Sequence, residues 1–373
     1  MKNIGITGAN GFIGNHLKNT LNLEDAKYNI INFERSFFDN KQDLDSFVEK
    51  CDVIIHLAGL NRHENQEVIH DTNIKLSQNL VDSLNRVDKN CHVIMSSSSQ
   101  EKLDNLYGKS KKQARELFVD WSNENNKNIF TGLIIPNVFG PFGLPNYNSV
   151  VATFCYKLLN GETPKIINDS ELNLIYVAEL ISEIVKVIES NESNPEKVIR
   201  SSKTIKVSKL LSQLLIFKES YFLNGNIPTL DSDFDLNLFN TFRSYLNLEE
   251  YFPFKLTQHK DDRGAFTEII RLGIGGQVSF STTVPGITRG NHFHTRKVER
   301  FTVIKGKALI ELRKIGSDKV YEFLLDGNEP SYVDMPIWYT HNIKNIGEDT
   351  LLTHFWINES FDPENHDTYF EIV

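Results

Sequence analysis

The sequence predicts an α/β part followed by an all-β part, and three observations lead to this expectation. The chain has 373 residues, more than a single domain usually holds, so two domains are expected. Residues 1–20 read as a short strand, a glycine-rich turn and a helix. From about residue 255 onward, apolar segments of strand length alternate with glycine and proline, which is the pattern of an antiparallel barrel.

Composition and charge favour a globular cytoplasmic protein. Hydrophobic residues make up 40% and charged residues 24% of the chain, the net charge is -9, and the pI is near 5.7. No long basic run is present, which argues against nucleic acid or an anionic membrane as a partner, and no apolar run could span a membrane. The three cysteines show no CxxC spacing and no signal peptide opens the chain, so reduced thiols in the cytoplasm are expected.

Three glycines in the N-terminal turn, Gly8, Gly11 and Gly14, have the spacing of a phosphate-binding loop. Such a turn lets the backbone approach a pyrophosphate and points a helix N-terminus at it. The spacing alone is weak evidence, because glycines also simply make turns. Its position between an expected strand and an expected helix favours dinucleotide binding.

The residues after the second expected strand bear on the choice of nucleotide. This strand covers residues 28–33 and is followed by Glu34 and Arg35. An acidic side chain here prefers a ribose 2′-hydroxyl, whereas an arginine accommodates a 2′-phosphate. Arg35 therefore favours NADPH, although Glu34 argues for NADH.

Later segments suggest an acid–base pair at the start of a helix. Residues 50–60 read as a strand buried on both faces, in which His56 is expected to be a core histidine, and the strand at 92–99 ends in four serines. Tyr107 and Lys111 are four residues apart and so share one helix face. The lysine is expected to lower the pKa of the phenol, which would make Tyr107 a general acid near neutral pH. A solvated helix start would carry the same residues without function.

The segments TGANGFIG, HLAG, SSSS and YGKSK together resemble those of the extended short-chain dehydrogenase/reductase family, over roughly residues 1–245. The resemblance implies a Rossmann-type, doubly wound parallel sheet that binds a nicotinamide and reduces a ketone. Its catalytic positions are Tyr107, Lys111 and Ser98, with Ser97 as the fallback because four serines leave the register open. The other implied cofactor contacts are Gly8, Asn10, Gly11, Phe12, Ile13, Gly14, Arg35, Leu57 and Ala58.

Two features depart from the family pattern. Only eight residues separate Ser98 from Tyr107, which implies a more open substrate pocket, and Pro136 stands where many extended members carry arginine. Family members usually grip a nucleotide sugar in the region that follows. Candidate substrate contacts there are Asn137, Asn148 and Ser149, for which ordinary loop capping is the alternative.

A second cluster of candidate site residues lies in the all-β part. His292 and His294 are two residues apart and so point to the same face of a strand. Glu299 opens the next apolar run, and His341, after a later proline, is the candidate fourth ligand. Imidazoles and a carboxylate on one face suit a divalent transition metal. A surface turn with incidental histidines is the alternative.

These residues lie in two segments that look like the paired motifs of the cupin superfamily. The first, Gly-x5-His-x-His-x4-Glu-x6-Gly, fits fully from Gly286 to Gly306. The second, Pro-x4-His-x3-Asn, also fits, but Trp338 stands where a glycine is usual. The resemblance implies a small antiparallel barrel with zinc, or another divalent transition metal, in its mouth.

Further segments are similar to the cupin-type 3,5-epimerases of 4-keto-6-deoxy sugars. They are a DxRGxFxE-like stretch from Asp261 to Glu268 and an RGxH stretch ending at His292. In those epimerases this histidine is the base and no metal is needed, so that role does not transfer if His292 binds a metal. The candidates for proton donor and acceptor are then Tyr339, Lys305, Glu268 and His354.

Over its full length the chain is identified as a member of the bifunctional reductase/epimerase family of capsular polysaccharide synthesis. The segments that carry this resemblance are PNYNSVVATFCYK, PGITRGNH and FDPENHDTYFEIV. It implies a reductase domain over residues 1–248 and a cupin epimerase domain over 249–373. The implied reactions are C3 epimerisation of a UDP-2-acetamido-2,6-dideoxy-4-hexulose and then NADPH-dependent C4 reduction, toward UDP-N-acetyl-L-fucosamine. A homodimer is also implied.

Three alternatives remain open from the sequence. The cupin could be a structural or dimerising module of a simple sugar reductase, with a structural metal. The dinucleotide fold could bind its cofactor as a sensor without turnover, against which the intact Tyr107 and Lys111 pair speaks. The substrate could also be a 4-keto sugar with a different base or C2 substituent.

Overall fold

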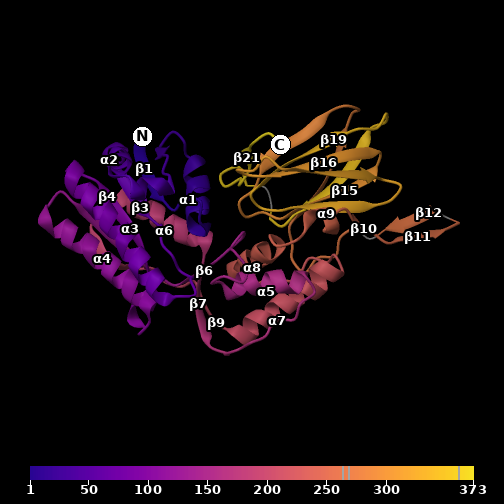
Figure 1. Cartoon of the computed structure of the whole chain (residues 1–373). Helices are drawn as coiled ribbons and strands as arrows, with labels where there is room; N and C mark the ends of the chain where they lie inside the picture. The colour runs from indigo at the N-terminus through magenta and orange to yellow at the C-terminus, as the bar shows by residue number, and fades with distance from the viewer. Residues whose placement is uncertain (263, 268, 360–361) are drawn as a thin grey trace. The chain divides into compact units, whose positions relative to one another are not determined.

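The computed structural model describes residues 1–262, 264–267, 269–359 and 362–373. The chain forms two compact units, residues 1–153 with 168–207, and residues 154–167 with 208–373 (Figure 1). The domain boundary expected between residues 248 and 249 falls inside the second unit and stays a prediction. None of the helices in these described ranges is long and apolar enough to cross a membrane.

The first unit is built on a six-stranded parallel sheet. Its strand order is β2-β1-β3-β4-β5-β8. The strands are β1 (Lys2–Thr7), β2 (Tyr28–Ile31), β3 (Val53–His56), β4 (His92–Ser98), β5 (Ile129–Ile135) and β8 (Asn194–Val198). All four residues of β3 are buried, as expected for a strand covered on both faces. A smaller three-stranded sheet contains β6 (Asn137–Phe139), β7 (Glu171–Tyr176) and β9 (Lys203–Lys206).

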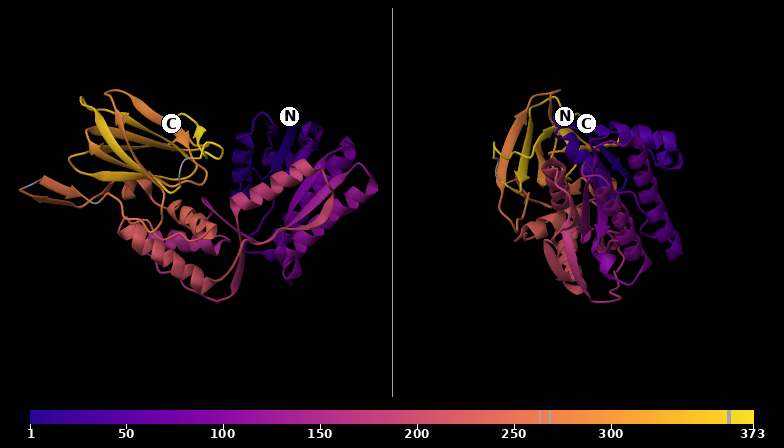
Figure 2. Two further views of the ribbon diagram at one scale, coloured as in Figure 1. Left: turned by 180° about the vertical axis from the view of Figure 1, so that it is seen from behind. Right: turned by 90° about the vertical axis from the view of Figure 1, so that its left-hand side faces the viewer.

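Helices cover both faces of the large sheet (Figures 1 and 2). One layer holds α1 (Phe12–Asn22) and α6 (Val177–Ser190), which contact each other; the other holds α2 (Lys41–Lys50), α3 (Gln66–Val87) and α4 (Leu106–Glu124). Three further helices lie before residue 160. They are the short helices η1 (Arg35–Asp39) and η2 (Ser99–Lys102) and the helix α5 (Val150–Leu159). The doubly wound parallel sheet is therefore confirmed. Its strand order reverses between β1 and β3, and ligands of such sheets bind at the carboxyl ends of the strands there.

The second unit contains two five-stranded antiparallel sheets, with strand orders β10-β18-β15-β20-β13 and β17-β16-β19-β14-β21. Their strands are β10 (Phe254–Lys255), β13 (Gln277–Thr283), β14 (Thr288–Phe293), β15 (Glu299–Lys305), β16 (Lys307–Lys314), β17 (Val320–Asp326), β18 (Ser331–Met335), β19 (Tyr339–Asn345), β20 (Leu351–Ile357) and β21 (Tyr369–Phe370). A separate hairpin joins β11 (Gln258–Asp261) and β12 (Gly264–Thr267). The antiparallel β domain predicted from the alternating segments is confirmed.

The alternation of β16 shows why these residues form a barrel. Ala308, Ile310 and Leu312 are fully buried between the sheets, while the residues between them are only partly buried. Successive strand residues point to opposite faces, so this pattern places one apolar row in the core. The three cysteines are free and buried, and each therefore packs as a small apolar residue.

A buried polar cluster attaches helices of the second unit to its barrel. These helices are α7 (Val207–Phe217), η3 (Lys218–Leu223), α8 (Asp233–Arg243) and α9 (Leu248–Tyr251). Arg300 Nε donates to Asp334 Oδ1 at 2.7 Å, and the hydroxyl of Tyr221 in η3 donates to Asp334 Oδ2 at 2.7 Å. Arg243 in α8 donates to the carbonyl of Met335 at 3.2 Å. Strands β15 and β18 are thus tied to η3 and α8 through hydrogen bonds that are all buried.

Candidate functional site

The N-terminal glycine turn is closed so tightly that two of its glycines admit no side chain. Gly8 has a φ of +78°, and a Cβ on it would lie 2.9 Å from the backbone nitrogen of Ala58. A Cβ on Gly14 would lie 2.2 Å from the carbonyl oxygen of Gly8, and the N–H of Gly11 donates to that oxygen at 3.0 Å. Because α1 begins directly after this turn, its exposed N–H groups are available to an anion. The geometry fits a nucleotide pyrophosphate.

The loop after β3 lies beside this turn at the point where the strand order reverses. The N–H of Leu57 donates to the carbonyl of Thr7 at 3.1 Å, and the N–H of Ala58 donates to Thr7 Oγ1 at 3.3 Å. The structure thus brings the two expected cofactor segments together. Arg35 is exposed at the start of η1, and β2 ends at Ile31, two residues earlier than expected. The remaining expected contacts, Asn10, Phe12 and Ile13, lie in the turn and the first turn of α1.

The strand preceding α4 delivers a serine to the expected catalytic tyrosine. Ser98 is the last residue of β4, and its hydroxyl hydrogen-bonds the phenol of Tyr107. The hydroxyl of Ser97 instead donates to the carboxylate of Glu101. The structure therefore places Ser98, rather than Ser97, against Tyr107. Lys111 follows one turn later on the same helix and is buried.

The pKa expected for the tyrosine is wrong in this structure. Burial raises the pKa of Tyr107, although the hydrogen bond with Ser98 acts in the opposite direction. The ammonium of Lys111 donates to the carbonyl of Ser96 at 3.0 Å, and burial lowers the pKa of Lys111 to about 8. A raised pKa keeps the phenol protonated at neutral pH, which is the form that a general acid requires.

Hydrogen bonds between two loops form one edge of this site. Arg62 Nη1 donates to the carbonyl of Tyr147 at 2.7 Å, and Asn148 Nδ2 donates to the carbonyl of Asn61 at 2.7 Å. Asn148 thus serves the loop contact, whereas Asn137 is exposed at the start of β6. Tyr147 lies close enough to the expected catalytic tyrosine to raise its pKa. Sequence reasoning missed Tyr147, because no spacing distinguishes it from other loop tyrosines.

His56 is a core residue, as expected. Its Nδ1 lies 2.8 Å from the hydroxyl of Thr7 and its Nε2 lies 3.3 Å from that of Ser77. Burial, followed by the nearby Lys111, lowers the pKa of His56 to about 3. The neutral imidazole therefore packs between strand and helix and is occupied on both sides.

The four expected metal ligands converge between the two sheets of the barrel. His292 comes from β14, His294 directly follows β14, Glu299 opens β15 and His341 lies in β19. Their ligand atoms all lie within 4.8 Å of one another. Zinc bonds to nitrogen and oxygen are about 2.0–2.2 Å long, so ligand atoms around one ion lie up to about 4.4 Å apart. Small side-chain movements are enough to close this cluster on one ion.

The carboxylate is the centre of the cluster. Glu299 Oε2 lies 3.1 Å from His294 Nε2, 3.2 Å from His341 Nε2 and 4.0 Å from His292 Nε2. Burial alone would raise the pKa of Glu299, but the contacts with His294 and His341 lower it well below its ordinary range. Burial lowers the pKa of His292 to about 4, so this imidazole is neutral at pH 7. Burial alone would lower the pKa of His294, but its hydrogen bond with Glu299 and the charge of that carboxylate raise it. Neutral imidazoles and an ionised carboxylate are the forms that bind a metal, so metal binding would release any proton that His294 shares with Glu299.

His341 shows the clearest sign of an intended ligand. It is 0% exposed, and its Nε2 lies 3.2 Å from Glu299 Oε2 but makes no well-aligned hydrogen bond within the described part of the chain. Its Nδ1 lies 3.3 Å from the carbonyl of Tyr339, which fixes that nitrogen as the donor and leaves Nε2 for a metal. A buried polar atom without a well-formed hydrogen bond is costly. A divalent ion bound among the four side chains would accept the lone pair of this nitrogen.

Trp338 explains why a glycine is usual at its position. Its φ is +61°, a left-handed conformation that residues with a Cβ rarely adopt. Its ring stacks on Phe293 with centroids 5.6 Å apart. The backbone N–H of Trp338 donates to the carbonyl of His294 at 2.8 Å. Gly286 and Gly306, the first and last residues of the first cupin motif, also have positive φ. The departure from the motif thus keeps the backbone shape and adds an aromatic contact.

Two of the candidates for proton transfer lie away from the cluster. Phe355 of β20 packs on Phe301 inside the barrel, so its neighbour His354 points to the opposite face. Lys305 is exposed at the far end of β15, about 20 Å along the strand from the cluster at about 3.3 Å per residue. Both were wrong as candidates, while Glu268 lies outside the described residues. Tyr339 shares a strand face with the ligand two residues later.

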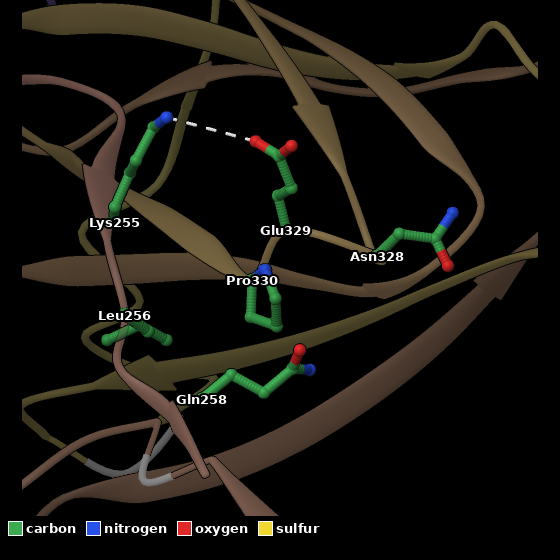
Figure 3. Close-up of a pocket in the computed structure, with 6 residues that line it drawn as sticks. All are labelled: Lys255, Leu256, Gln258, Asn328, Glu329 and Pro330. Atoms are coloured by element: carbon green, nitrogen blue, oxygen red, sulfur yellow. Dashed lines mark ion pairs between the residues drawn. The ribbon is translucent and has the colours of Figure 1, made fainter. Parts of the chain in front are cut away.

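A surface hollow elsewhere on the second unit holds none of these residues. It has a volume of about 340 Å³ and is lined by Lys255, Leu256, Gln258, Asn328, Glu329 and Pro330 (Figure 3). Lys255 and Glu329 form an ion pair of 3.8 Å across it, and both side chains are 79% exposed. An open hollow with exposed charges lacks the buried, convergent polar groups of a binding site. It is therefore set aside.

Two family models match the chain. Residues 4–200 match the NAD dependent epimerase/dehydratase family, and residues 259–369 match the polysaccharide biosynthesis C-terminal domain. The first match covers the parallel sheet with the glycine turn and the serine, tyrosine and lysine. The second covers the barrel with its four converging ligands.

Two relatives match along nearly the whole chain, and a third structure matches part of it. A UDP-2-acetamido-2,6-beta-L-arabino-hexul-4-ose reductase from Pseudomonas aeruginosa is 34% identical over 368 residues, which cover 98% of this chain and 97% of that protein. The crystal structure of the capsular polysaccharide assembling protein CapF from Staphylococcus aureus is 37% identical, covers 100% of both chains and has a TM-score of 0.62. RMD from Pseudomonas aeruginosa, solved with NADPH, is 17% identical over 59% of this chain and 82% of that chain, with a TM-score of 0.52, and shares the fold.

Proposed function

Because this chain belongs to the CapF-type family of capsular polysaccharide enzymes, we propose that it is a bifunctional nucleotide-sugar enzyme. Its substrate is a UDP-2-acetamido-2,6-dideoxy-4-hexulose. The name of the Pseudomonas relative, a reductase of such a UDP-linked hexulose, supports this choice. The barrel, residues 249–373, inverts C3, and residues 1–248 then reduce the C4 ketone with NADPH, toward UDP-N-acetyl-L-fucosamine. The enzyme acts in the cytoplasm as a homodimer.

In the reduction, bound NADPH would supply the hydride that C4 of the sugar takes up. Tyr107 donates its phenolic proton to the carbonyl oxygen, while Ser98, which already bonds that phenol, hydrogen-bonds the same oxygen. The positive charge of Lys111 stabilises the phenolate that remains after the proton leaves. Gly8 and Gly14 keep side chains out of the space that the pyrophosphate needs. The ketone, NADPH and the proton of Tyr107 together give the alcohol, NADP+ and the phenolate, which then takes up a proton from solvent.

In the epimerisation, His292, His294, Glu299 and His341 would hold a divalent metal, which would supply Lewis-acid polarisation of the ketone. The C4 ketone acidifies the hydrogen on C3, so a base can remove it and a proton can return to the other face. Tyr339 is the candidate for one of these transfers, since its side chain shares a strand face with His341. Reduction afterwards fixes the configuration, because an alcohol cannot enolise.

The observation that carries the proposal is that one chain holds both constellations. Ser98 contacts Tyr107 one helical turn before Lys111, and a separate barrel brings together three imidazoles and a carboxylate. A simple reductase needs only the first constellation. A barrel that serves only for dimerisation does not need three imidazoles gathered around a buried carboxylate.

The deciding experiment omits the reductant. The zinc-loaded protein is incubated in D2O with the UDP-linked 4-keto sugar and without NADPH, and deuterium at C3 is followed by NMR. We expect exchange that disappears in His292→Ala and after metal removal. Tyr156→Phe, which changes a tyrosine outside both constellations, is the matched control and keeps the exchange.

Two outcomes contradict the proposal. Absence of exchange, with ketone reduction once NADPH is added, would make the barrel a structural module of a simple sugar reductase. Exchange that survives both the His292→Ala change and the removal of the metal would place the epimerisation elsewhere.

A further inference from the structure

The loop between two of the metal ligands, residues 295–298, is organised around a carboxylate from the C-terminal segment. This carboxylate belongs to Asp367, which is 3% exposed. Its oxygens accept hydrogen bonds from three successive backbone N–H groups and one hydroxyl. The donors are the N–H of Thr295 at 3.0 Å, of Arg296 at 3.0 Å and of Lys297 at 3.2 Å, and Thr295 Oγ1 at 2.6 Å.

Successive N–H groups that converge on one anion form a backbone nest. The fourth N–H of the loop, that of Val298, donates to Asn358 Oδ1 at 2.8 Å, so side-chain oxygens satisfy all four. A buried loop without such acceptors would leave its N–H groups unpaired, at a cost for each of them. The conformation of this loop sets how His294 approaches Glu299, since it joins them. By holding this loop in one conformation, the carboxylate of Asp367 fixes the position of His294 relative to Glu299.

The backbone of the same residue contacts a ligand directly. The carbonyl oxygen of Asp367 is hydrogen-bonded to His294 Nδ1. A carbonyl can only accept, so Nδ1 must carry a hydrogen and Nε2 is the nitrogen that faces Glu299, 3.1 Å away. Metal-binding histidines are oriented by such a bond on the other ring nitrogen, and its loss weakens the site.

The C-terminal segment is held along the ligand strand from both sides of Asp367. Phe370 and Tyr369 of β21 pair with His292 and Phe293 of β14. Before Asp367, the carbonyl of His366 accepts a hydrogen bond from Lys297 Nζ at 2.6 Å. Asp367 itself has a φ of +40°, in the left-handed region. The segment is thus part of the wall of the metal site.

We infer that Asp367 is a positioning residue of the metal site. Its carboxylate fixes the loop that joins two ligands, and its carbonyl fixes the tautomer and direction of His294. It is not itself among the converging ligand atoms. The inference deepens the proposed function and rests on it, because it takes the cluster to bind a divalent metal.

The test measures zinc affinity of the full-length apo protein by competition with a chromophoric chelator. We expect Asp367→Asn, which removes the charge and keeps the shape, to bind Zn2+ about 10–100-fold more weakly. Glu364→Gln, an exposed acid three residues earlier, is the matched control and keeps the wild-type affinity. With Co2+ in place of zinc, the visible absorption of the Asn variant is expected to change in position or intensity, as the ligand directions change.

A purely structural role would lower the stability of the protein without these effects. Circular dichroism and the unfolding of the apo form are therefore measured in parallel. A folded Asp367→Asn variant whose Zn2+ affinity is within twofold of the wild type and whose Co2+ spectrum is unchanged would overturn the inference. If the wild type itself binds neither Zn2+ nor Co2+, the proposed metal function is wrong. If the wild type binds them and the Asn variant binds them equally well, only the inference about Asp367 is wrong.

Discussion

Arg115 and Glu101 form a buried ion pair beneath the candidate reductase site, with Arg115 Nη2 2.9 Å from Glu101 Oε2 and Nε 3.0 Å from Oε1. Arg115 lies four residues after Lys111 and eight after Tyr107, so the three share one face of α4. Glu101 belongs to η2, directly after the strand that ends at Ser98. The pair therefore fixes the helix with the acid to the strand end with the serine.

Glu101→Gln is expected to destabilise the protein more than the loss of a surface ion pair. It leaves the guanidinium of Arg115 buried with one charged partner, Glu196, which is 69% exposed. Removing one member of a buried pair costs about 3–5 kcal/mol of unfolding free energy, and the remaining partner places this case near about 3 kcal/mol. Urea unfolding gives the value. Glu116→Gln breaks an exposed pair with Lys112 on the same helix and is expected to cost less than about 1 kcal/mol. Equal costs for the two variants would contradict the assignment.

Reductase activity is expected to fall as the pH rises through about 8, the value to which burial lowers the pKa of Lys111. Above this pH the lysine is neutral and no longer stabilises the phenolate of Tyr107. Glu101 raises the pKa of Lys111, so Glu101→Gln is expected to shift the fall to lower pH. The pH dependence of kcat/KM for the two proteins checks this. A profile that stays in place in the variant would remove Lys111 from the explanation.

The same shift predicts a pH dependence of stability with a definite sign. From about pH 8 to the ordinary value of 10.5, the folded chain has released the Lys111 proton and the unfolded chain still holds it. The unfolded state then binds more protons, so the free energy of unfolding rises with pH in this window. Urea unfolding of the wild type and Lys111→Met at several pH values isolates the contribution. A slope that is identical in the Met variant would contradict it.

Tyr107→Phe is expected to abolish NADPH oxidation with the keto sugar and to leave C3 exchange intact. The variant keeps the ring but loses the hydroxyl that bonds Ser98 and donates the proton. NADPH consumption and deuterium incorporation at C3 are measured on the same preparation. A near wild-type oxidation rate in the variant would show that another group is the acid. Loss of both activities would show that the two sites do not work separately.

Side chains marked by local spacing were predictable from the sequence, and those that depend on tertiary packing were not. The alternation of Ala308, Ile310 and Leu312 gave the barrel strand directly, since a strand repeats every two residues. The glycine turn and the four ligands follow from spacing in the same way. Asp367 lies 68 residues beyond Glu299, and nothing local distinguishes it from other acids of the chain. Only the folded loop shows what its carboxylate contacts.

The pKa of Tyr107 illustrates the same limit. The i,i+4 spacing correctly placed Lys111 on its helix face, but the spacing carries no information on burial. Burial acts on the two groups in opposite directions, since it disfavours the charged form of each. The register of the serines was also beyond the sequence, because it depends on where β4 ends.

Arg35→Ala is expected to raise the KM for NADPH about tenfold, which corresponds to about 1.4 kcal/mol, and to leave the KM for NADH nearly unchanged. The exposed guanidinium at the start of η1 is available to a 2′-phosphate, which NADH lacks. Steady-state kinetics with both nucleotides give the ratio. Glu34→Ala is the matched change next to it and is expected to weaken NADH instead. If Arg35→Ala affects both nucleotides equally, the residue does not select the cofactor.

Trp338→Gly is expected to change the free energy of unfolding in two opposite ways. A left-handed backbone costs a residue with a Cβ about 1–2 kcal/mol, which glycine recovers. The ring is 7% exposed and stacks on Phe293, and removal of such a side chain costs about 3–5 kcal/mol. The variant is therefore expected to be destabilised by about 2–3 kcal/mol despite restoring the residue usual in cupins.

Trp338→Ala separates these two effects, because it loses the ring and keeps the strained backbone. It is expected to be less stable than the glycine variant by about 1 kcal/mol, the reverse of the usual order of alanine and glycine. Urea unfolding of both variants measures the difference. Zinc affinity is expected to change little in either, since the N–H of residue 338 that bonds the carbonyl of His294 is kept. An alanine variant more stable than the glycine variant would show that the positive φ of Trp338 carries no strain.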